Sequence, residues 1–340
     1  MMDVFIKSFN RAYYLDRAIY SLKKYLVGEY QITVLDDGTP QRYLDKIKEK
    51  YPEVEIKANE SAARKSKAIR ENIEKGTEIN GFIIPTKLWK EAVKNASSYF
   101  IMTEDDVWLT EEVDLSKSES IMISHKSVLL KIGWISQRKI NAKLHSLSQD
   151  IETIEPRFYV GPRALMKALF ENKLKLYSLL RRLKVVTSET FNDYWVMNSL
   201  LMGVYRKDYW LYLWNGIEGR VDEQMQLLNA TQWYRKYKNN LHNYSKFKKL
   251  KMNTTFISSA TNSYHKYKVD CDINYFNYIM NEAWYAGEFD SLKNFPKDIP
   301  EDYYIQFLEK NYSERCTPEN WKKWASYFKE QYRRQEVDVD

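Results

Sequence analysis

The chain has 340 residues, of which 44% are hydrophobic, and its formal net charge is +7. This hydrophobic fraction excludes a globally disordered chain, and the length suits one large α/β domain with an appendage or two domains. No apolar run is long enough to cross a bilayer, and the start MMDVFIKSFNR turns polar too soon for a signal peptide. The modest positive charge excludes little, because it suits an anionic substrate, a membrane surface or a nucleic acid.

The first part of the chain alternates short apolar runs with helical patterns. Strands are predicted at residues 4–6, 31–35 and 54–56, and the first two are followed by helices at residues 15–26 and 43–50. This alternation predicts a parallel sheet with right-handed crossover connections.

A fourth strand, at residues 99–102, ends in the acidic run Glu104, Asp105 and Asp106. Three adjacent carboxylates repel one another, so the cluster is costly unless water or a cation shares it. The carboxyl end of a buried strand is also where open α/β sheets bind their ligands. Oxygen ligands of this kind suit Mg²⁺ or Mn²⁺, which bind through one or two carboxylates and substrate phosphates. An acidic turn without a ligand is the alternative.

Two basic helical patterns precede this strand, at residues 61–76 and 85–96. Four of their side chains could face phosphates, and a solvated helix face is the alternative for each: Arg64, Lys67, Arg70 and Lys87.

The second half of the chain continues the sheet and then changes character. Edge elements of the sheet are predicted at residues 120–124 and 128–134, short strands at 157–160 and 254–259, and a helix at 221–234. From Cys271 onward the chain is helical and aromatic. We therefore expect an α/β domain over residues 1–268 and a helical extension over residues 269–340.

Location and assembly are suggested by three further features. Cys271 and Cys316 are the only cysteines, too few for a disulfide framework, which predicts a reducing, cytoplasmic location. Residues 174–184, LKLYSLLRRLK, could lie on the anionic inner face of a membrane. The alternative is that their leucines face the core and their basic residues face water. The helical extension could mediate a homo-oligomer, or its aromatic residues could pack within the chain.

Three short motifs follow predicted strands in order along the chain. They are Ser8-Phe9-Asn10-Arg11, Val34-Leu35-Asp36-Asp37-Gly38-Thr39 and Glu104-Asp105-Asp106. They resemble the Y-N-R, V-D-D-G-S and D-x-D phrases of GT-A glycosyltransferases of the family 2 type. The resemblance is specific up to the acidic motif, weak from there to Tyr267, and absent from the tail. It implies a GT-A, Rossmann-like α/β fold, in which helices flank a mostly parallel sheet, here with a helical C-terminal extension.

The resemblance implies a metal-dependent, inverting glycosyltransferase. Such an enzyme moves a sugar from a nucleotide-sugar donor, with a UDP-sugar favoured over a GDP-sugar, to a hydroxyl of a glycan, glycolipid or glycoprotein. It further implies that donor binding involves the motif residues, and we expect Lys87 to join them as a basic side chain that could face a phosphate. The predicted donor-binding residues are Ser8, Phe9, Asn10, Arg11, Asp36, Asp37, Lys87 and Asp105. Asp37 would contact the base, although a plain turn is the alternative for Asp36-Asp37-Gly38.

The resemblance also implies a Mn²⁺ or Mg²⁺ ion bound directly by Asp106. Glutamate replaces the first Asp of the family motif, so it is open whether Glu104 or Asp105 assists Asp106. Some GT-A enzymes complete the metal shell with a histidine after a late strand, where this chain has His265. A structural or exposed histidine is the alternative.

An inverting transfer needs a general base that accepts the proton of the attacking hydroxyl. In the family an Asp or Glu at a helix start has this role, and two candidates remain open. Asp222 and Glu223 are favoured because the strand that ends at His265 then follows at the usual interval, whereas Asp193 lies nearer in sequence to the acidic motif. For each, a favourable interaction with the helix dipole is the alternative.

A hypothesis from another class concerns the tract from Trp233 to Met252. It interleaves aromatic and basic side chains, as single-strand nucleic-acid-binding proteins do. The strand-end carboxylates disfavour it, because without a cation they would repel phosphates.

Overall fold

The computed structural model describes residues 1–79, 81–134, 140–184, 186, 190–260, 267–334 and 336–339. The main sheet consists of β1 (Met2–Ser8), β3 (Tyr30–Asp36), β4 (Glu55–Ala58), β5 (Tyr99–Glu104), β8 (Leu129–Lys131), β9 (Ala142–Ser146), β10 (Ile151–Pro156), β11 (Gly203–Arg206) and β12 (Tyr244–Phe247). Over the described residues, the strand order is β4-β3-β1-β5-β11-β8-β12-β10-β9. Two small sheets pair β13 (Met252–Thr254) with β6 (Val107–Leu109) and β2 (Leu26–Val27) with β7 (Val113–Asp114).

The strands β4, β3, β1 and β5 run parallel to one another. Their register pairs Ser8 with Asp36 and Lys7 with Glu104, so the carboxyl ends of β1, β3 and β5 meet at one edge. β11 runs antiparallel to β5 and β8, β12 is parallel to β8, and β10 and β9 complete the sheet in antiparallel pairs. The predicted α/β class is confirmed, and its uninterrupted parallel part comes from the N-terminal region.

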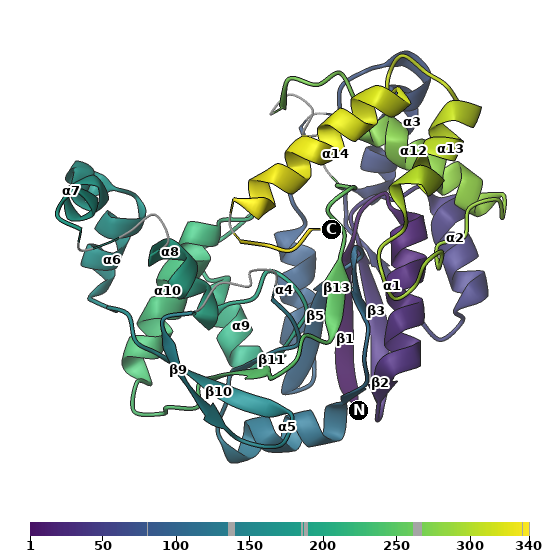
Figure 1. Cartoon of the computed structure of the whole chain (residues 1–340). Coiled ribbons are helices and arrows are strands. Elements are labelled where there is room, and N and C mark those ends of the chain that lie inside the picture. The colour runs from purple at the N-terminus through teal and green to yellow at the C-terminus, as the bar shows by residue number, and fades with distance from the viewer. Residues whose placement is uncertain are drawn as a thin grey trace.

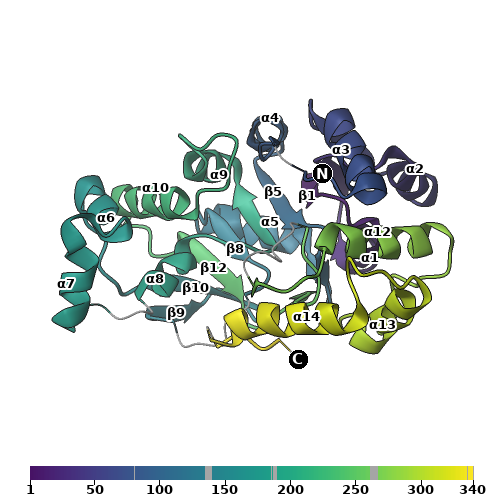
Figure 2. The ribbon, with the colours of Figure 1, turned by 90° about the horizontal axis from the view of Figure 1, so that it is seen from above.

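Helices cover both faces of the sheet (Figures 1 and 2). Because side chains alternate along a strand, Val4 and Ile6 of β1 enter one hydrophobic core and Phe5 enters the other. The first core packs against α1 (Ala12–Tyr25), α2 (Gln41–Lys50), α5 (Leu115–Ser124), α12 (Ile273–Tyr285), α13 (Glu301–Lys310) and α14 (Pro318–Arg333). The second packs against α4 (Thr86–Lys94), α6 (Arg163–Phe170), α9 (Lys207–Leu213) and α10 (Glu223–Lys236). The other helices are α3 (Ala62–Lys75), α7 (Leu176–Arg182) and α8 (Thr190–Asp193), with 3-10 turns η1 (Lys173–Lys175) and η2 (Tyr194–Met197).

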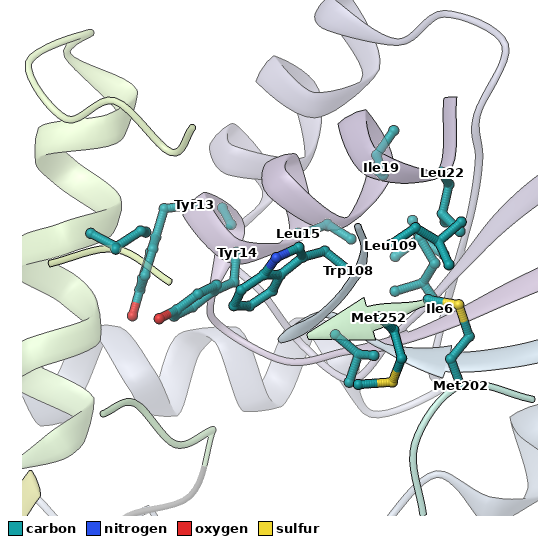
Figure 3. Packing of buried hydrophobic residues seen from close by; sticks show 14 of the residues in the cluster. Ile6, Tyr13, Tyr14, Leu15, Ile19, Leu22, Trp108, Leu109, Met202 and Met252 are labelled. Atoms are coloured by element: carbon teal, nitrogen blue, oxygen red, sulfur yellow. The ribbon is translucent and has the colours of Figure 1, made fainter. Parts of the chain in front are cut away.

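The helix α1 anchors the strand that follows the acidic run (Figure 3). Its apolar residues recur at helical spacing, and its buried face carries Tyr14 and Leu15 into the first core. The Tyr14 ring stacks on Trp108 of β6 at a centroid distance of 6.1 Å. The Leu109 amide donates a hydrogen bond to Ser21 Oγ at 2.9 Å. These contacts set the direction in which the chain leaves the end of β5.

The C-terminal helices pack on the N-terminal part of the sheet. Asn281 of α12 accepts a hydrogen bond from the Ala12 amide at 2.8 Å through its Oδ1. Trp284 Nε1 donates to Asp16 Oδ2 at 2.9 Å. The first core includes residues of both regions. The helical character predicted for the tail is therefore present, while a domain boundary at residue 268 stays a prediction.

One predicted edge element was wrong in type. Residues 120–124 lie in the helix α5, which buries Leu115 and Met122 on one face. Asp114 caps this helix by accepting a hydrogen bond from the Lys117 amide at 2.9 Å. Periodicity does not separate strand from helix in such a short run, and the cap decides for the helix.

The other predicted sheet elements differ in position or extent. Residues 128–134 contain β8, which lies inside the sheet between β11 and β12 and not at an edge. Residues 157–160 form no strand, because the chain leaves the sheet after β10 and exposes Tyr159. In the segment 254–259, β13 already ends at Thr254.

The segment 174–184 includes the end of η1 and all of α7, and neither element has a buried residue. Leu174, Leu179 and Leu183 are exposed, so the alternative that they face the core was wrong for these leucines. Across the described residues, no helix combines the length and the apolar character needed to span a membrane.

Candidate active site

The three carboxylates at the end of β5 differ in their surroundings. Asp105 is turned inward and only 1% exposed. It accepts hydrogen bonds from Arg11 Nη2 at 2.5 Å, from Ser8 Oγ at 3.1 Å and from the Phe9 amide at 3.1 Å. Burial raises the pKa of Asp105, and the Arg11 guanidinium acts against this rise. Asp105 thus ties β5 to the end of β1.

Asp106 and Glu104 point to the other side. The side chain of Asp106 is 18% exposed, and its Oδ2 lies 2.8 Å from Arg11 Nη1. The side chain of Glu104 is 39% exposed and pairs with Lys7 Nζ at 2.5 Å. Both carboxylates line a cavity of about 410 Å³. The turn therefore separates one structural carboxylate from two that a ligand can reach.

The cavity is built from segments far apart in the sequence. Glu104 and Asp106 line it from the end of β5, Glu223 from the first turn of α10, and Phe328 and Tyr332 from α14. Further aromatic lining comes from α4, β11, the region of α9 and the loop after β13: Trp89, Tyr205, Trp210, Trp214 and Phe256. The site combines acidic groups with broad aromatic surfaces.

Two cavity-lining residues hold buried polar atoms without a partner in the described part of the chain, Trp89 Nε1 and Thr103 Oγ1. Buried polar groups in native proteins are nearly always hydrogen-bonded. At the wall of a cavity, water or a bound ligand can supply the missing hydrogen-bond partners of these two atoms.

The structure separates the candidates for the general base. Glu223 lines the cavity together with Glu104 and Asp106, and burial and the charge of Glu104 raise the pKa of Glu223. Asp222 instead caps α10, accepting a hydrogen bond from the Met225 amide at 2.9 Å.

Asp222 also pairs with Arg220 at 2.8 Å and lines a neighbouring cavity of about 580 Å³. Val221 and Glu223 line both cavities. Asp193 is buried in α8, where its Oδ1 lies 3.4 Å from the Asn141 amide, and it is not among the described residues that line either cavity.

Asp36 and Asp37 are both bonded within the protein. Asp36 accepts hydrogen bonds from the amides of Gly38 at 2.8 Å and Thr39 at 3.0 Å, and burial raises the pKa of Asp36 to about 6. Asp37 lies beside Lys65 at 2.5 Å and Asn59 at 3.1 Å. Asp36 therefore shapes the turn after β3, whereas Asp37 belongs to a neutralised cluster at the same sheet edge.

Two residues of the first motif frame this cluster. The Lys65 ammonium lies 4.0 Å from the centroid of the Phe9 ring. The Asn10 amide donates a hydrogen bond to Thr39 Oγ1 at 2.8 Å, and Asn10 Nδ2 is buried without a partner among the described residues. The side chains of Thr39 and Lys65 thus tie residues of the predicted donor site together at the ends of β1 and β3.

The remaining predicted positions lie apart from this arrangement. Lys87 is exposed on α4 and pairs with Glu60 at 2.6 Å. It lines neither cavity described above. His265 lies outside the described residues.

The residues present fit a divalent cation to a limited degree. Mg²⁺ needs only one or two protein carboxylates when substrate phosphates supply the rest, and Glu104 and Asp106 offer two at the cavity. In the described ranges, no group of three or more His, Cys, Asp or Glu side chains could hold a metal by itself. A cation here would depend on oxygen atoms of a bound diphosphate.

Most of the large rings in the basic and aromatic tract at 233–252 are withdrawn from solvent, and Tyr237 is the exposed exception among its described residues. Trp233, Tyr244 and Phe247 are buried in the two cores. Since a base can stack only on an accessible ring, this weakens the nucleic-acid hypothesis.

Sequence reasoning missed the tryptophans of the cavity, Lys7 and the two rings of α14. The aromatic composition of the tail could have pointed to Tyr332. The sequence does not indicate, however, which face of the last helix meets the edge of the sheet.

No family model matches the chain, and no curated protein matches it. Among solved structures, residues 1–349 of TarS from S. aureus are similar over 100% of this chain and 97% of that one, with 13% identity and a TM-score of 0.42. The same TarS segment in complex with UDP is similar over 92% of this chain and 72% of that one, with 14% identity and a TM-score of 0.40. The galactosyltransferase LgtC, solved with donor and acceptor sugar analogs, is similar over 72% of this chain and 67% of that one, with 14% identity and a TM-score of 0.31.

Proposed function

We propose that the protein is a glycosyltransferase that moves a sugar from a nucleotide-sugar donor to a hydroxyl group of an acceptor. The single observation that carries this proposal is the cavity shared by Glu104, Asp106 and Glu223. Such a transfer needs an acidic edge for a cation-bound diphosphate and a separate carboxylate for the acceptor proton. The order of the three strand-end motifs supports the same conclusion.

In this proposal Glu223 is the general base. The acceptor oxygen attacks the anomeric carbon, the bond from that carbon to the phosphate oxygen breaks, and Glu223 accepts the hydroxyl proton. A base works best when its pKa lies near the operating pH, and burial together with Glu104 moves the pKa of Glu223 upward from its ordinary value. Direct displacement of this kind inverts the anomeric configuration.

Glu104 and Asp106 would hold a Mn²⁺ or Mg²⁺ ion together with the donor diphosphate. A bound cation supplies charge neutralisation for the departing nucleoside diphosphate. Lys7 and Arg11 keep the two carboxylates in place at the cavity. Arg11 also pairs with Asp105, so the orientation of Asp106 is coupled to the buried part of the turn.

The nucleoside would lie along the ends of β1 and β3. Asp37, fixed by Lys65 and Asn59, is the proposed contact of the base, and Phe9 is the proposed wall. A UDP-sugar is the proposed donor, and a glycan, glycolipid or glycoprotein is the proposed acceptor.

The test uses the full chain with a panel of UDP- and GDP-sugars in the presence of Mn²⁺, Mg²⁺ or a chelator. The expected result is release of nucleoside diphosphate from at least one UDP-sugar, with loss of release in the chelator. Product NMR should show an inverted anomeric centre. Folded protein that neither binds nor hydrolyses any donor would contradict the proposal, and activity that survives the chelator would contradict its metal dependence.

We also propose that the region of α7 contacts an anionic membrane surface at its cytoplasmic face. The exposed side chains of Leu174, Leu179 and Leu183 lie among several basic residues of the same short segment. Apolar insertion combined with attraction to acidic lipids is the usual basis of peripheral membrane binding.

Sedimentation with vesicles tests this contact. The wild type should sediment with phosphatidylglycerol vesicles and not with phosphatidylcholine vesicles, and Leu179→Ser with Leu183→Ser should reduce sedimentation. Equal behaviour with both vesicle types would overturn it. Oligomerisation through the C-terminal helices stays a prediction. Trp321 and Trp324 of α14 pack within the chain itself, so these two side chains are not available to a second copy.

A further inference from the structure

The helix α14 is the last helix of the chain (Figures 1 and 2), and two of its residues line the cavity of the candidate active site. Phe328 and Tyr332 are one helical turn apart, so they share a face of α14, and both line the cavity that contains Glu104, Asp106 and Glu223. Nothing in the strand-end motifs requires a contribution from this helix.

Tyr332 is held in place from several sides. Its ring lies 5.0 Å from the Phe256 ring and 5.3 Å from the Phe328 ring, measured between centroids. After α14 the chain turns back, and the Val337 amide donates a hydrogen bond to the Tyr332 carbonyl at 3.2 Å. Val337 and Val339 then pack against Phe256 in a small core of their own. The ring is thus fixed at the cavity by contacts formed on both sides of it.

The hydroxyl group of Tyr332 is free for a ligand, since no described residue forms a hydrogen bond with it. Burial first, and then the charges of nearby groups that include Asp106, Glu104 and Glu223, raise the pKa of Tyr332 to about 12. The group stays protonated at neutral pH and acts as a hydrogen-bond donor. A partner that enters the cavity could accept this hydrogen bond.

The chemistry of this wall suits a sugar ring, and its place beside the proposed diphosphate edge and base favours the sugar over the nucleobase. A pyranose has an apolar face that packs on aromatic rings, and its edge carries hydroxyls that accept and donate hydrogen bonds. Phe328 and Tyr332 supply the rings, the Tyr332 hydroxyl supplies a donor, and the carboxylates supply acceptors. The same cavity contains the proposed diphosphate edge and the proposed base, between which a transferred sugar must lie.

We propose that Tyr332 and Phe328 bind the sugar of the donor, so that the C-terminal helix is a specificity-determining part of the active site. This inference rests on the proposed function and adds the residues that distinguish a nucleotide sugar from the bare nucleotide. It assigns a role to the tail, which has no counterpart in the motifs.

Calorimetry on the full chain tests the inference by comparing two ligands. The dissociation constants are measured for UDP and for the best-bound member of a panel containing UDP-glucose, UDP-galactose and UDP-N-acetylglucosamine. Tyr332→Ala should weaken binding of the nucleotide sugar about tenfold, a typical loss for a buried aromatic contact, and change UDP binding less than about twofold. Tyr332→Phe keeps the ring and should lose only part of the affinity.

Tyr327→Ala is the matched control, because Tyr327 lies on the same helix and is 45% exposed. It should change neither dissociation constant. Thermal unfolding of each variant verifies the fold, and if Tyr332→Ala does not fold, Tyr332→Phe and Phe328→Leu still separate the two ligands.

The inference would be overturned if Tyr332→Ala lost equal affinity for UDP and for the nucleotide sugar, or if the folded variant lost none. Binding of both ligands by the wild type would in that case still support the proposed function. A wild type that binds neither ligand would overturn the proposed function itself, and the inference with it.

Discussion

Glu223, in the first turn of α10, lies near enough to Glu104, at the end of β5, for the charge of Glu104 to raise the pKa of Glu223. The two residues belong to segments that no local pattern connects, yet they line one cavity. The pair joins the proposed diphosphate edge to the proposed base, and it makes the function open to direct tests.

Replacing the base should abolish transfer without abolishing donor binding. Glu223→Gln removes the proton acceptor and keeps the shape, so we expect kcat to fall about 10²- to 10⁴-fold while the dissociation constant for the donor changes little. Steady-state kinetics together with calorimetry measure both quantities.

Asp222→Asn is the matched control for this variant. It alters the neighbouring cap of α10, and since Asn is also a good cap, stability and kcat should both stay close to the wild type. A loss of activity in Asp222→Asn equal to that in Glu223→Gln would contradict the assignment of the base.

The activity should depend on pH in a defined direction. A base must be ionised, so kcat should fall as the pH drops through the pKa of Glu223, which burial and Glu104 place above its ordinary value. In Glu104→Gln the charge of Glu104 is gone, so in the cation-free protein the pKa of Glu223 should decrease. An NMR titration of Glu223 without a divalent cation, in the wild type and in Glu104→Gln, measures this change. An unchanged titration would show that the two groups are not coupled.

Asp105 and Asp106 should differ in their effect on stability. Asp105→Asn leaves Arg11 with one carboxylate in a buried site, and we expect the free energy of unfolding to fall by about 3 kcal/mol, as for other broken buried ion pairs. Asp106→Asn lies nearer to solvent and should cost less, while it should weaken cation-dependent donor binding more. Urea denaturation measures the first effect. A cost for Asp105→Asn below about 1 kcal/mol would mean that Asp105 is already uncharged in the folded protein.

The turn after β3 should tolerate no side chain at Gly38. This residue has φ of +113°, and a Cβ atom there would lie 2.9 Å from Lys65 Cβ and 3.1 Å from the Ala62 carbonyl oxygen. Gly38→Ala should therefore destabilise the fold by more than about 2 kcal/mol and displace Lys65 from Asp37, which weakens UDP binding.

Gly76→Ala is the control for backbone strain alone. Gly76 also has positive φ, +69°, but nothing lies within 4 Å of the added Cβ. The expected cost is about 1 kcal/mol with unchanged UDP binding. Equal losses at the two glycines would show that crowding by Lys65 contributes nothing.

The sequence by itself determined the parallel core and the order of its strand-end motifs. Apolar runs followed by polar residues mark the ends of β1, β3 and β5, because burial of a strand and the turn that ends it are local properties of the chain. The parallel connection through helices then brings Ser8, Asp36 and Glu104 to one edge. The same local signals failed for α5, since a short apolar run becomes a helix or a strand according to what packs against it.

Only the tertiary structure decided which residue of two adjacent acidic pairs, Asp105 with Asp106 and Asp222 with Glu223, faces the cavity of the candidate active site. Asp105 turns inward because it forms a buried ion pair with Arg11, which follows β1. The adjacent residue Asp106 lines the cavity. Asp222 caps a helix while Glu223 lines the site, a difference of one position that depends on how α10 meets the sheet. Tyr332 joins them because the tail packs on the first core. The direction of a side chain is set by its long-range neighbours, and adjacent residues in a chain do not encode those neighbours locally.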